Sequence, residues 1–571
     1  SDLIGFTFDK IRENLFVPHL GVANDTISSG VVENMMGEMV ERIFTLNNDL
    51  RVKYTKTFNM SHNLMAMGGV RNAVNKVQGD WGYGYNSPND QSHSVGTGLP
   101  GMRTVNGFLG DWNWVTVYAK GGYNYQKRYF LDVNLALDGS SRYGKDANGV
   151  SLFGNKFGFF PSVAAAWLLS SEKFISGADF INLLKFRMSY GITGNDDIGN
   201  KSALRYYTSQ NFLGAQGIVA GNLANSSIQW ETVKKTDVGL DLSVAKERIN
   251  LTFDVYSNQT ENLLNFLPAD QFTGFDSYLT NDGAFKSTGF DAGLNIRVIN
   301  GANFKWDIGA TVSKYTTEIT SFPGGADGRI TDIMGANILT RVGEPVGVFY
   351  GYKALGVFST QQEADASGLR ALMPNTDLVP FSAGDVHFQD VNGDKVIDQQ
   401  DMQIIGDPNP DMIGMFSSAL SWKGISLDAA FTFKYGGDVF NQVRYTLESM
   451  QNADNQTPVV LNRWKSEGQV TDIPKAQWGD PIGNSRFSDR WIEDGSYIRL
   501  KSITLSYKLP VMPQFINGLQ IFVTGQNLFT WTNYLGMDPE FSFSGTALSQ
   551  GIDIGLTPQP RSVSAGVRIG L

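Results

Sequence analysis

Between positions 390 and 401, the residue types and their spacing match a calcium-binding loop. Oxygen-bearing side chains stand at positions 1, 3, 5, 9 and 12 of an EF-hand-type pattern, and a backbone carbonyl is available at position 7. Oxygen ligands in this number suit a hard cation such as Ca²⁺. The spacing therefore predicts a structural Ca²⁺ site whose ligands, in chain order, are Asp390, Asn392, Asp394, Val396, Asp398 and Asp401.

Two residues of this loop depart from the pattern. Lys395 stands at position 6, where glycine normally makes the sharp turn, and a left-handed non-glycine residue costs about 1–2 kcal/mol. Asp401 is shorter than the glutamate usually found at position 12. The alternative interpretation is an aspartate-rich turn without an ion. A glycine-rich stretch at 324–328 is interpreted as a plain turn.

The chain offers little to catalysis. It contains no cysteine and 4 histidines, and none of the histidines belongs to an HExxH motif. A GxSxG nucleophile elbow and a GxxxxGK[ST] phosphate loop are both missing from the sequence. A glycosidase-type carboxylate pair is a weak alternative, because separations in space are not legible in the sequence. We predict that the protein is not an enzyme and has no catalytic residues.

A cluster of aromatic residues is the second candidate for ligand contact. Trp81, Tyr83 and Tyr85 fall in a segment, 76–110, that we predict to be the first long loop. Aromatic faces stack on sugar rings or on peptide side chains, so these residues are candidates for substrate contact. The competing interpretation, packing within the loop or against a lid, is the one we favour.

The elements that position these residues show a period of two. In the segment 128–138, Leu131, Val133 and Leu135 alternate with polar residues such as Asp132 and Asn134. Alternate side chains of a strand point to opposite faces, so such a segment has one apolar and one polar face. The pattern recurs at 238–244, 249–256, 290–297 and 427–434. Repeated carboxylates on the polar face suit an aqueous lumen, and the apolar face suits lipid, which together predict an all-β transmembrane antiparallel barrel.

Short and long connections alternate along the chain, as in outer-membrane barrels. Tight turns are predicted at 126–127, 246–247, 300–301 and 423–424. The longest connection, 318–411, carries the aspartate motif and is predicted to be extracellular. The count is about sixteen strands, predicted at 2–8, 43–58, 63–75, 111–125, 128–138, 157–169, 183–193, 232–245, 248–263, 283–299, 304–317, 412–422, 425–435, 495–509, 518–531 and 561–571.

Composition narrows the class of protein. The chain has 571 residues, which is too long for one ordinary soluble core, and it contains no apolar run of about 18 residues that would form a membrane helix. Its net charge of −10 argues against a nucleic-acid partner. The sequence begins at Ser1 without a signal peptide, so we expect either processing or the later part of a longer chain.

Several stretches together resemble a known family. They include YQKRYFLDVNLALDGSSRYG at 125–144, LKFRMSYGITGN at 184–195 and DGSYIRLKSITLSYKLP at 494–510. Others lie at 159–174, 230–242, 384–401 and 523–540. In order and spacing they are similar to the SusC/RagA family of TonB-dependent outer-membrane transporters, and the resemblance runs from about Trp112 to the C-terminus.

This resemblance implies a barrel of about 22 strands closed by an N-terminal plug. It also implies import of oligosaccharides or peptides, energy from TonB acting on a TonB box, and a SusD-like surface lipoprotein as a lid. The sequence shows no TonB box and no plug-like segment. We therefore expect residues 1–571 to be the C-terminal part of the barrel, completed by another segment, because an open sheet edge in lipid is costly.

The predicted function is TonB-dependent import of a large nutrient in the bacterial outer membrane. The expected partners are a SusD-like lipoprotein, TonB through a plug, outer-membrane lipid and the oligosaccharide or peptide substrate. The alternative is a structural barrel subunit of a surface or secretion complex without transport. A third possibility is a Ca²⁺-dependent surface adhesin. Substrate specificity resides in loops whose shapes are not predicted from the sequence, so the sequence does not decide between an oligosaccharide and a peptide.

Overall fold

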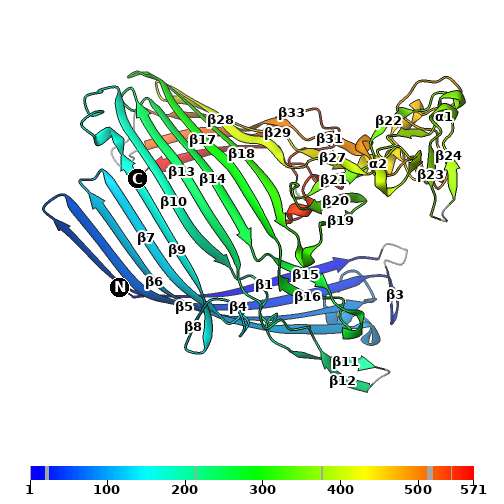
Figure 1. Cartoon of the computed structure of the whole chain (residues 1–571), viewed down its shortest axis with the longest axis horizontal. Coiled ribbons are helices and arrows are strands. Elements are labelled where there is room, and N and C mark those ends of the chain that lie inside the picture. Colours follow the sequence, from blue (N-terminus) through cyan, green and yellow to red (C-terminus); the bar gives the residue numbers. More distant parts are fainter. Residues whose placement is uncertain are drawn as a thin grey trace. The chain divides into compact units, whose positions relative to one another are not determined.

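A computed structural model of the chain describes residues 2–19, 25–212, 215–374, 377–510, 518–541 and 543–570. These residues are nearly all in strands and loops. The α-helices among them are short, α1 (Gln361–Ser367) and α2 (Gln442–Glu448). In this part of the chain, no helix is long and apolar enough to cross a membrane. The prediction of an all-β fold is confirmed (Figure 1).

The described residues form one large sheet of 17 strands, and smaller sheets in the connections. The short strand β8 (Val150–Leu152) pairs with β9, and the remaining strands match the predicted sixteen. The long strands are β1 (Asp2–Val17), β4 (Met35–Phe58), β5 (His62–Tyr85), β6 (Thr104–Tyr125), β7 (Tyr129–Ser140), β9 (Asn155–Leu168), β10 (Ile181–Asn195), β13 (Glu231–Val244), β14 (Ile249–Glu261), β17 (Ala284–Asn300), β18 (Phe304–Ser321), β28 (Pro410–Trp422), β29 (Ile425–Gly436), β32 (Tyr497–Lys508), β33 (Gly518–Thr532) and β35 (Ser562–Gly570).

The chain divides into two compact units. Unit 1 comprises Ser1–Ala166, Ser189–Lys235 and Thr260–Gly283. Unit 2 comprises Trp167–Met188, Thr236–Gln259 and Ala284–Leu571. The final residue of the predicted strand 561–571 and the connection predicted between 509 and 518 lie outside, or largely outside, the described residues.

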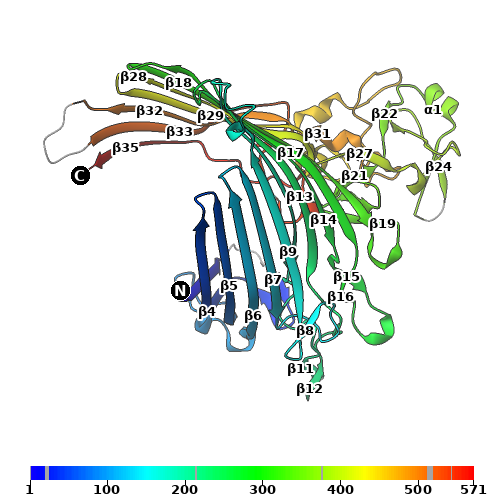
Figure 2. The same cartoon turned by 60° about the vertical axis from the view of Figure 1, so that its left-hand side comes forward.

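In unit 1, each of the strands β1, β4, β5, β6 and β7 pairs antiparallel with the next one in this order. Figure 2 shows β4 to β7 side by side. Residues paired across strands share a face. Leu50, Val70 and Val117 are paired in this way and are exposed, so they mark an apolar face. Asp49 and Arg71 mark the opposite face, where Arg71 Nη2 donates to Asp49 Oδ2 at 3.1 Å. The Tyr118 hydroxyl donates to the other oxygen of Asp49 at 2.7 Å, so this face is polar.

Unit 2 repeats this pattern. Strands β17, β18, β28, β29, β32, β33 and β35 pair antiparallel in that order. The turn predicted at 423–424 is present, with Lys423 at φ 47° and Gly424 at φ 90°. Positive φ at both central residues is the requirement of a two-residue type I′ hairpin turn, whose twist matches that of the flanking strands.

Several strands are longer than predicted. β5 runs to Tyr85 instead of ending at Asn75, and β6 begins at Thr104. The alternation of apolar and polar side chains fades beyond position 75, but the backbone pairing with β4 continues to Met35. The first long loop is therefore 86–103, shorter than the predicted 76–110.

The predicted long connection 318–411 is a folded region of unit 2. Phe358, Phe381 and Phe388 lie in a hydrophobic core, and Ile482 from the next long connection joins them. A second core unites Ala336, Phe349, Phe440, Trp491 and Ile552 from three connections. The strands in these connections are β19 (Gly328–Ile333), β20 (Ala336–Arg341), β21 (Val348–Gly351), β22 (Ala354–Val357), β23 (Arg370–Leu372), β24 (Leu378–Pro380), β25 (Val386–Phe388), β26 (Val396–Ile397), β27 (Gln403–Gly406), β30 (Asp438–Asn441), β31 (Ile492–Asp494) and β34 (Ile552–Asp553).

Unit 1 also has small hairpins in its connections. They are β2 (Asp25–Ile27) with β3 (Gly30–Val32), β11 (Tyr207–Phe212) with β12 (Ala215–Ala220), and β15 (Leu264–Pro268) with β16 (Ser277–Asn281). The last hairpin rests on a small core of Ile198, Ala203 and Ile228, against which Leu264 and Leu279 pack.

His387 should make the first of the two cores in unit 2 sensitive to pH. Its ring stacks on Phe358 with 4.5 Å between centroids, and burial lowers the pKa of His387, although Glu363 partly opposes this shift. A histidine with a depressed folded pKa contributes stability that is complete above its unfolded value of about 6.5 and declines as the pH falls through the folded value. We expect the protection factors of the amides in 354–374 and 377–388, calculated against the intrinsic exchange rate at each pH, to fall below about pH 6.5. The same dependence in the variant His387→Phe would contradict this assignment.

Candidate functional site

A pocket of about 830 Å³ lies in unit 1, on the polar face of the sheet. Its floor is formed by strands, with Glu41 from β4, Val77 from β5, and Phe108 and Trp112 from β6. These positions share a face with Arg71, because Trp112 is paired with Asn75 and Phe108 with Gly79 on the same strand as Arg71. Its walls come from 199–206, 221–223 and 266–279 in the connections.

Aromatic side chains dominate this pocket. Phe266 is 68% exposed and Phe108 is 47% exposed, although both line a concave surface. Exposed rings in a concave site are available for stacking and for apolar contact. The aromatic lining residues are Phe108, Trp112, Tyr206, Phe266, Phe275 and Tyr278.

The charged side chains of the pocket differ in the hydrogen bonds and ion pairs that other protein groups provide to them. Arg142 is held by the protein: its Nε donates to Asn200 Oδ1 at 2.9 Å, and its guanidinium lies 4.8 Å from the centre of the Trp112 ring. Lys201 places its ammonium 5.7 Å from the Tyr206 ring centre. Within the described part of the chain, neither Lys201 Nζ nor the Glu41 carboxylate forms an ion pair. Among the described residues, the pocket therefore offers one cation and one anion without an ion pair, on a lining of mixed aromatic and polar side chains.

The predicted substrate residues Trp81, Tyr83 and Tyr85 lie at the end of strand β5, not in a loop as the sequence suggested. All three are on the polar face. Trp81 lies 6.1 Å from Phe108 between ring centroids, so it supports the floor of the pocket. Tyr83 packs over Gly37, where a Cβ atom would lie 2.9 Å from its ring. Packing within unit 1 is thus directly visible, and substrate contact stays a prediction.

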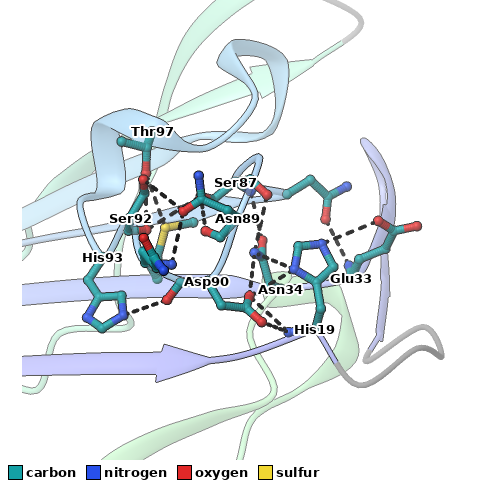
Figure 3. Close-up of polar contacts among 12 residues, drawn as sticks. His19, Glu33, Asn34, Ser87, Asn89, Asp90, Ser92, His93 and Thr97 are labelled. Carbon is teal, nitrogen blue, oxygen red and sulfur yellow. Dashed lines mark hydrogen bonds and ion pairs between the residues drawn. The ribbon is translucent and has the colours of Figure 1, made fainter.

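The loop that follows these aromatic residues is fastened by a polar cluster around Asn34 (Figure 3). Asn34 is fully buried; its Oδ1 accepts the Ser87 amide at 2.7 Å and its Nδ2 donates to Asp90 at 3.2 Å. His19 completes the cluster, with its Nδ1 2.8 Å from Asp90 Oδ1. Hydrogen bonds from His19 lower the pKa of Asp90. His93 of the same loop stacks on Phe16 of β1 at 4.2 Å.

Removing the Asn34 side chain should release this loop. The variant Asn34→Ala leaves the buried Ser87 amide without an acceptor, which costs about 1–3 kcal/mol. We expect limited proteolysis within 86–103 to accelerate by at least about fivefold. Gln91→Ala, in the same loop but exposed, is the matched control and should change the rate little. Equal rates in the two variants would show that the Asn34 contacts do not hold the loop.

The predicted Ca²⁺ ligands lie together, and their side chains mostly accept backbone amides. Asp390 accepts the amides of Gly393 and Lys395 at 2.7 and 2.9 Å. Asp401 accepts those of Val391 and Asp398 at 2.8 and 2.9 Å. Lys395 adopts φ 65°, the left-handed conformation expected from its position. Among the residues described, no group of three or more His, Cys, Asp or Glu side chains is arranged to hold a metal, so the ion stays a prediction.

A second pocket, of about 470 Å³, lies in unit 2 and was not foreseen from the sequence. Lys434, Tyr497 and Glu540 line it, together with proline, glycine and hydroxyl-bearing residues of the last long connection. The buried Arg499 pairs with Asp538 and also with Glu540, where Nε and Oε2 are 3.0 Å apart. The pocket is therefore built on a neutralised ion-pair cluster.

Comparison with known proteins decides the family. The family model described as TonB dependent receptor-like, beta-barrel matches residues 13–528. The chain belongs to this family. The TonB-dependent receptor P3 of Formosa agariphila is 32% identical over 537 residues, covering 90% of this chain and 51% of that protein. The TonB-dependent receptor SusC of Bacteroides thetaiotaomicron is 25% identical over 542 residues, covering 92% and 50%.

The chain spans about half the length of these curated relatives. A solved structure titled "Structure of the RagAB peptide transporter" has the same fold, with a TM-score of 0.79 and 22% identity over all of this chain and 59% of the other. These matches confirm the resemblance to the SusC/RagA family, the antiparallel β-barrel class and an outer-membrane location.

In this TonB-dependent receptor-like barrel, the first pocket draws its residues from positions as far apart as Glu41 and Leu279. Sequence reasoning found the neighbouring Trp81 but none of the lining residues. Only the unusual density of Phe, Tyr and Asn in 199–223 and 263–283 could have drawn attention to the walls.

Proposed function

We propose that the protein imports a large nutrient, an oligosaccharide or a peptide, across the outer membrane with energy supplied through TonB. The observation that carries the proposal is the aromatic pocket of about 830 Å³ on the polar face of a TonB-dependent receptor-like barrel. A polar face continued by Asp49, Arg71 and Tyr118 suits an aqueous path below such a pocket. The curated relatives carry receptor names, and the structural neighbour is titled a peptide transporter.

The proposal includes two partners. TonB would act on a plug, and a SusD-like lipoprotein would cover the outer end of the barrel. The folded connections of unit 2 support an outer surface for such a lid, because segments with their own hydrophobic cores present a fixed shape. In this proposal the connection 318–411 is extracellular, and a Ca²⁺ ion held by Asp390 and its neighbours would stiffen it.

Uptake in cells tests the proposal. A strain that lacks the protein is supplied with the full-length gene, with and without a functional TonB, and accumulation of labelled oligosaccharides and peptides is measured. Import that needs both the protein and TonB is the expected result. Uptake that persists without TonB, or that never depends on the protein, would contradict active transport and favour a structural barrel.

A further inference from the structure

We infer that the pocket of unit 1 binds oligopeptides with free termini and apolar side chains. The inference rests on the proposed function and names the substrate class of the same site. This pocket is lined by Glu41, Trp112, Lys201, Phe266 and their neighbours.

The first step is the rigidity of the pocket wall. Phe266 projects from the β15–β16 hairpin, whose residues Leu264 and Leu279 pack on a buried core. The hairpin backbone is also tied down: Leu264 N donates to Glu231 Oε1 at 2.9 Å, and Asn225 Nδ2 donates to Leu279 O at 3.1 Å. A ring held 68% exposed on a fixed backbone loses little conformational freedom when a ligand covers it.

The second step is the apolar character of the lining. Three of its aromatic residues are phenylalanines, Phe108, Phe266 and Phe275, which have no hydrogen-bonding group. Val77, Leu223 and Leu279 extend the same surface. The phenyl rings and aliphatic side chains of this lining gain free energy when they cover apolar side chains of a ligand.

The third step is the charge pattern. Arg142 is already satisfied by Asn200 and by the Asp196 carbonyl, at 2.9 and 3.1 Å. This leaves the Lys201 ammonium and the Glu41 carboxylate as the charges of the pocket that lack an ion pair within the described residues. An oligopeptide carries one ammonium and one carboxylate at its ends, and each would find its opposite charge. A neutral oligosaccharide offers neither charge.

Calorimetric titration of the detergent-purified full-length protein tests this inference. Each experiment removes one terminal charge from the peptide, or the opposite charge from the pocket, or both. The probes are apolar tri- to hexapeptides with free ends, their N-acetylated and C-amidated forms, and neutral malto- and xylo-oligosaccharides. We expect N-acetylation to weaken peptide binding about tenfold in the wild type and little in Glu41→Gln. C-amidation should likewise weaken peptide binding about tenfold in the wild type and little in Lys201→Met.

Two exposed phenylalanines of one connection supply a matched pair of variants. Phe266→Ala should weaken binding of the free peptides about fivefold, and Phe272→Ala, whose ring is 99% exposed and outside the pocket, should leave it unchanged. The inference is overturned if the oligosaccharides bind and the peptides do not, if nothing binds, or if end modification acts equally in wild type and variants. TonB-dependent uptake of sugars together with absent peptide binding would overturn this inference alone. Peptide binding without any uptake would overturn the proposed function alone.

Discussion

Replacing Arg499 with methionine is expected to destabilise the last long connection by about 3–5 kcal/mol. The side chain is 2% exposed and pairs with Asp538 and Glu540. Asp538 also accepts the amides of Glu540 and Gln559, at 2.8 and 2.9 Å. Without the guanidinium, two carboxylates lie close together with no buried cation between them. Hydrogen exchange at the amides of Glu540 and Gln559 measures the effect directly.

Lys501→Met is the matched control for this prediction. Lys501 lies on the same strand and contacts the same Glu540 at 3.2 Å, but it is 41% exposed, so its loss should cost less than about 1 kcal/mol. Adding Asp538→Leu to Arg499→Met should recover part of the stability, because it removes a stranded charge. Equal exchange rates in Arg499→Met and Lys501→Met would show that burial of the ion pair is not what secures the connection.

An arginine in place of Leu135 is expected to lower the free energy of unfolding in a lipid bilayer by about 2–4 kcal/mol. Leu135 lies in β7, is 42% exposed and is paired with Ala119 on the apolar face. A cation there faces hydrocarbon, and the penalty is largest at mid-depth. Denaturant unfolding of the protein reconstituted in phosphocholine vesicles gives the free energy.

Asn134→Arg, one residue away, probes the opposite face. Its cost should be about 1 kcal/mol, the value of the hydrogen bond that Asn134 Nδ2 donates to Ser162 Oγ at 3.1 Å. A penalty for Asn134→Arg as large as that for Leu135→Arg would mean that both faces of β7 lie in apolar surroundings.

The barrel strands were predictable because their signal is local. Leu131, Val133 and Leu135 alternate with polar neighbours within one segment, and the environment on each side imposes that period directly. The turn at Lys423 and Gly424 was legible for the same reason, since its residues decide the turn type. The extension of β5 to Tyr85 was missed because it depends on backbone pairing with Met35 and not on side-chain alternation.

The folded connections and the pocket were not predictable in this way. Ile482 joins a core with Phe358, and Ile552 joins one with Ala336, across separations that no local pattern encodes. The pocket likewise brings Glu41 next to residues near position 279. The aspartate motif was legible as a loop, but the amides of Gly393 and Lys395 that occupy Asp390 became visible only in three dimensions.

Cysteine scanning of β7 tests the two-faced strand most directly, because the chain has no cysteine of its own. Proteins with single cysteines at 130 to 137 are reconstituted in vesicles and treated with a water-soluble maleimide. In parallel samples a fluorophore is attached to each cysteine before reconstitution, and its quenching by a quencher confined to the acyl chains is measured. Positions 130, 132, 134 and 136 should react with the maleimide, and positions 131, 133, 135 and 137 should resist it and be quenched from the lipid. Uniform labelling along the strand, or quenching at the even positions, would contradict a barrel wall between lipid and water.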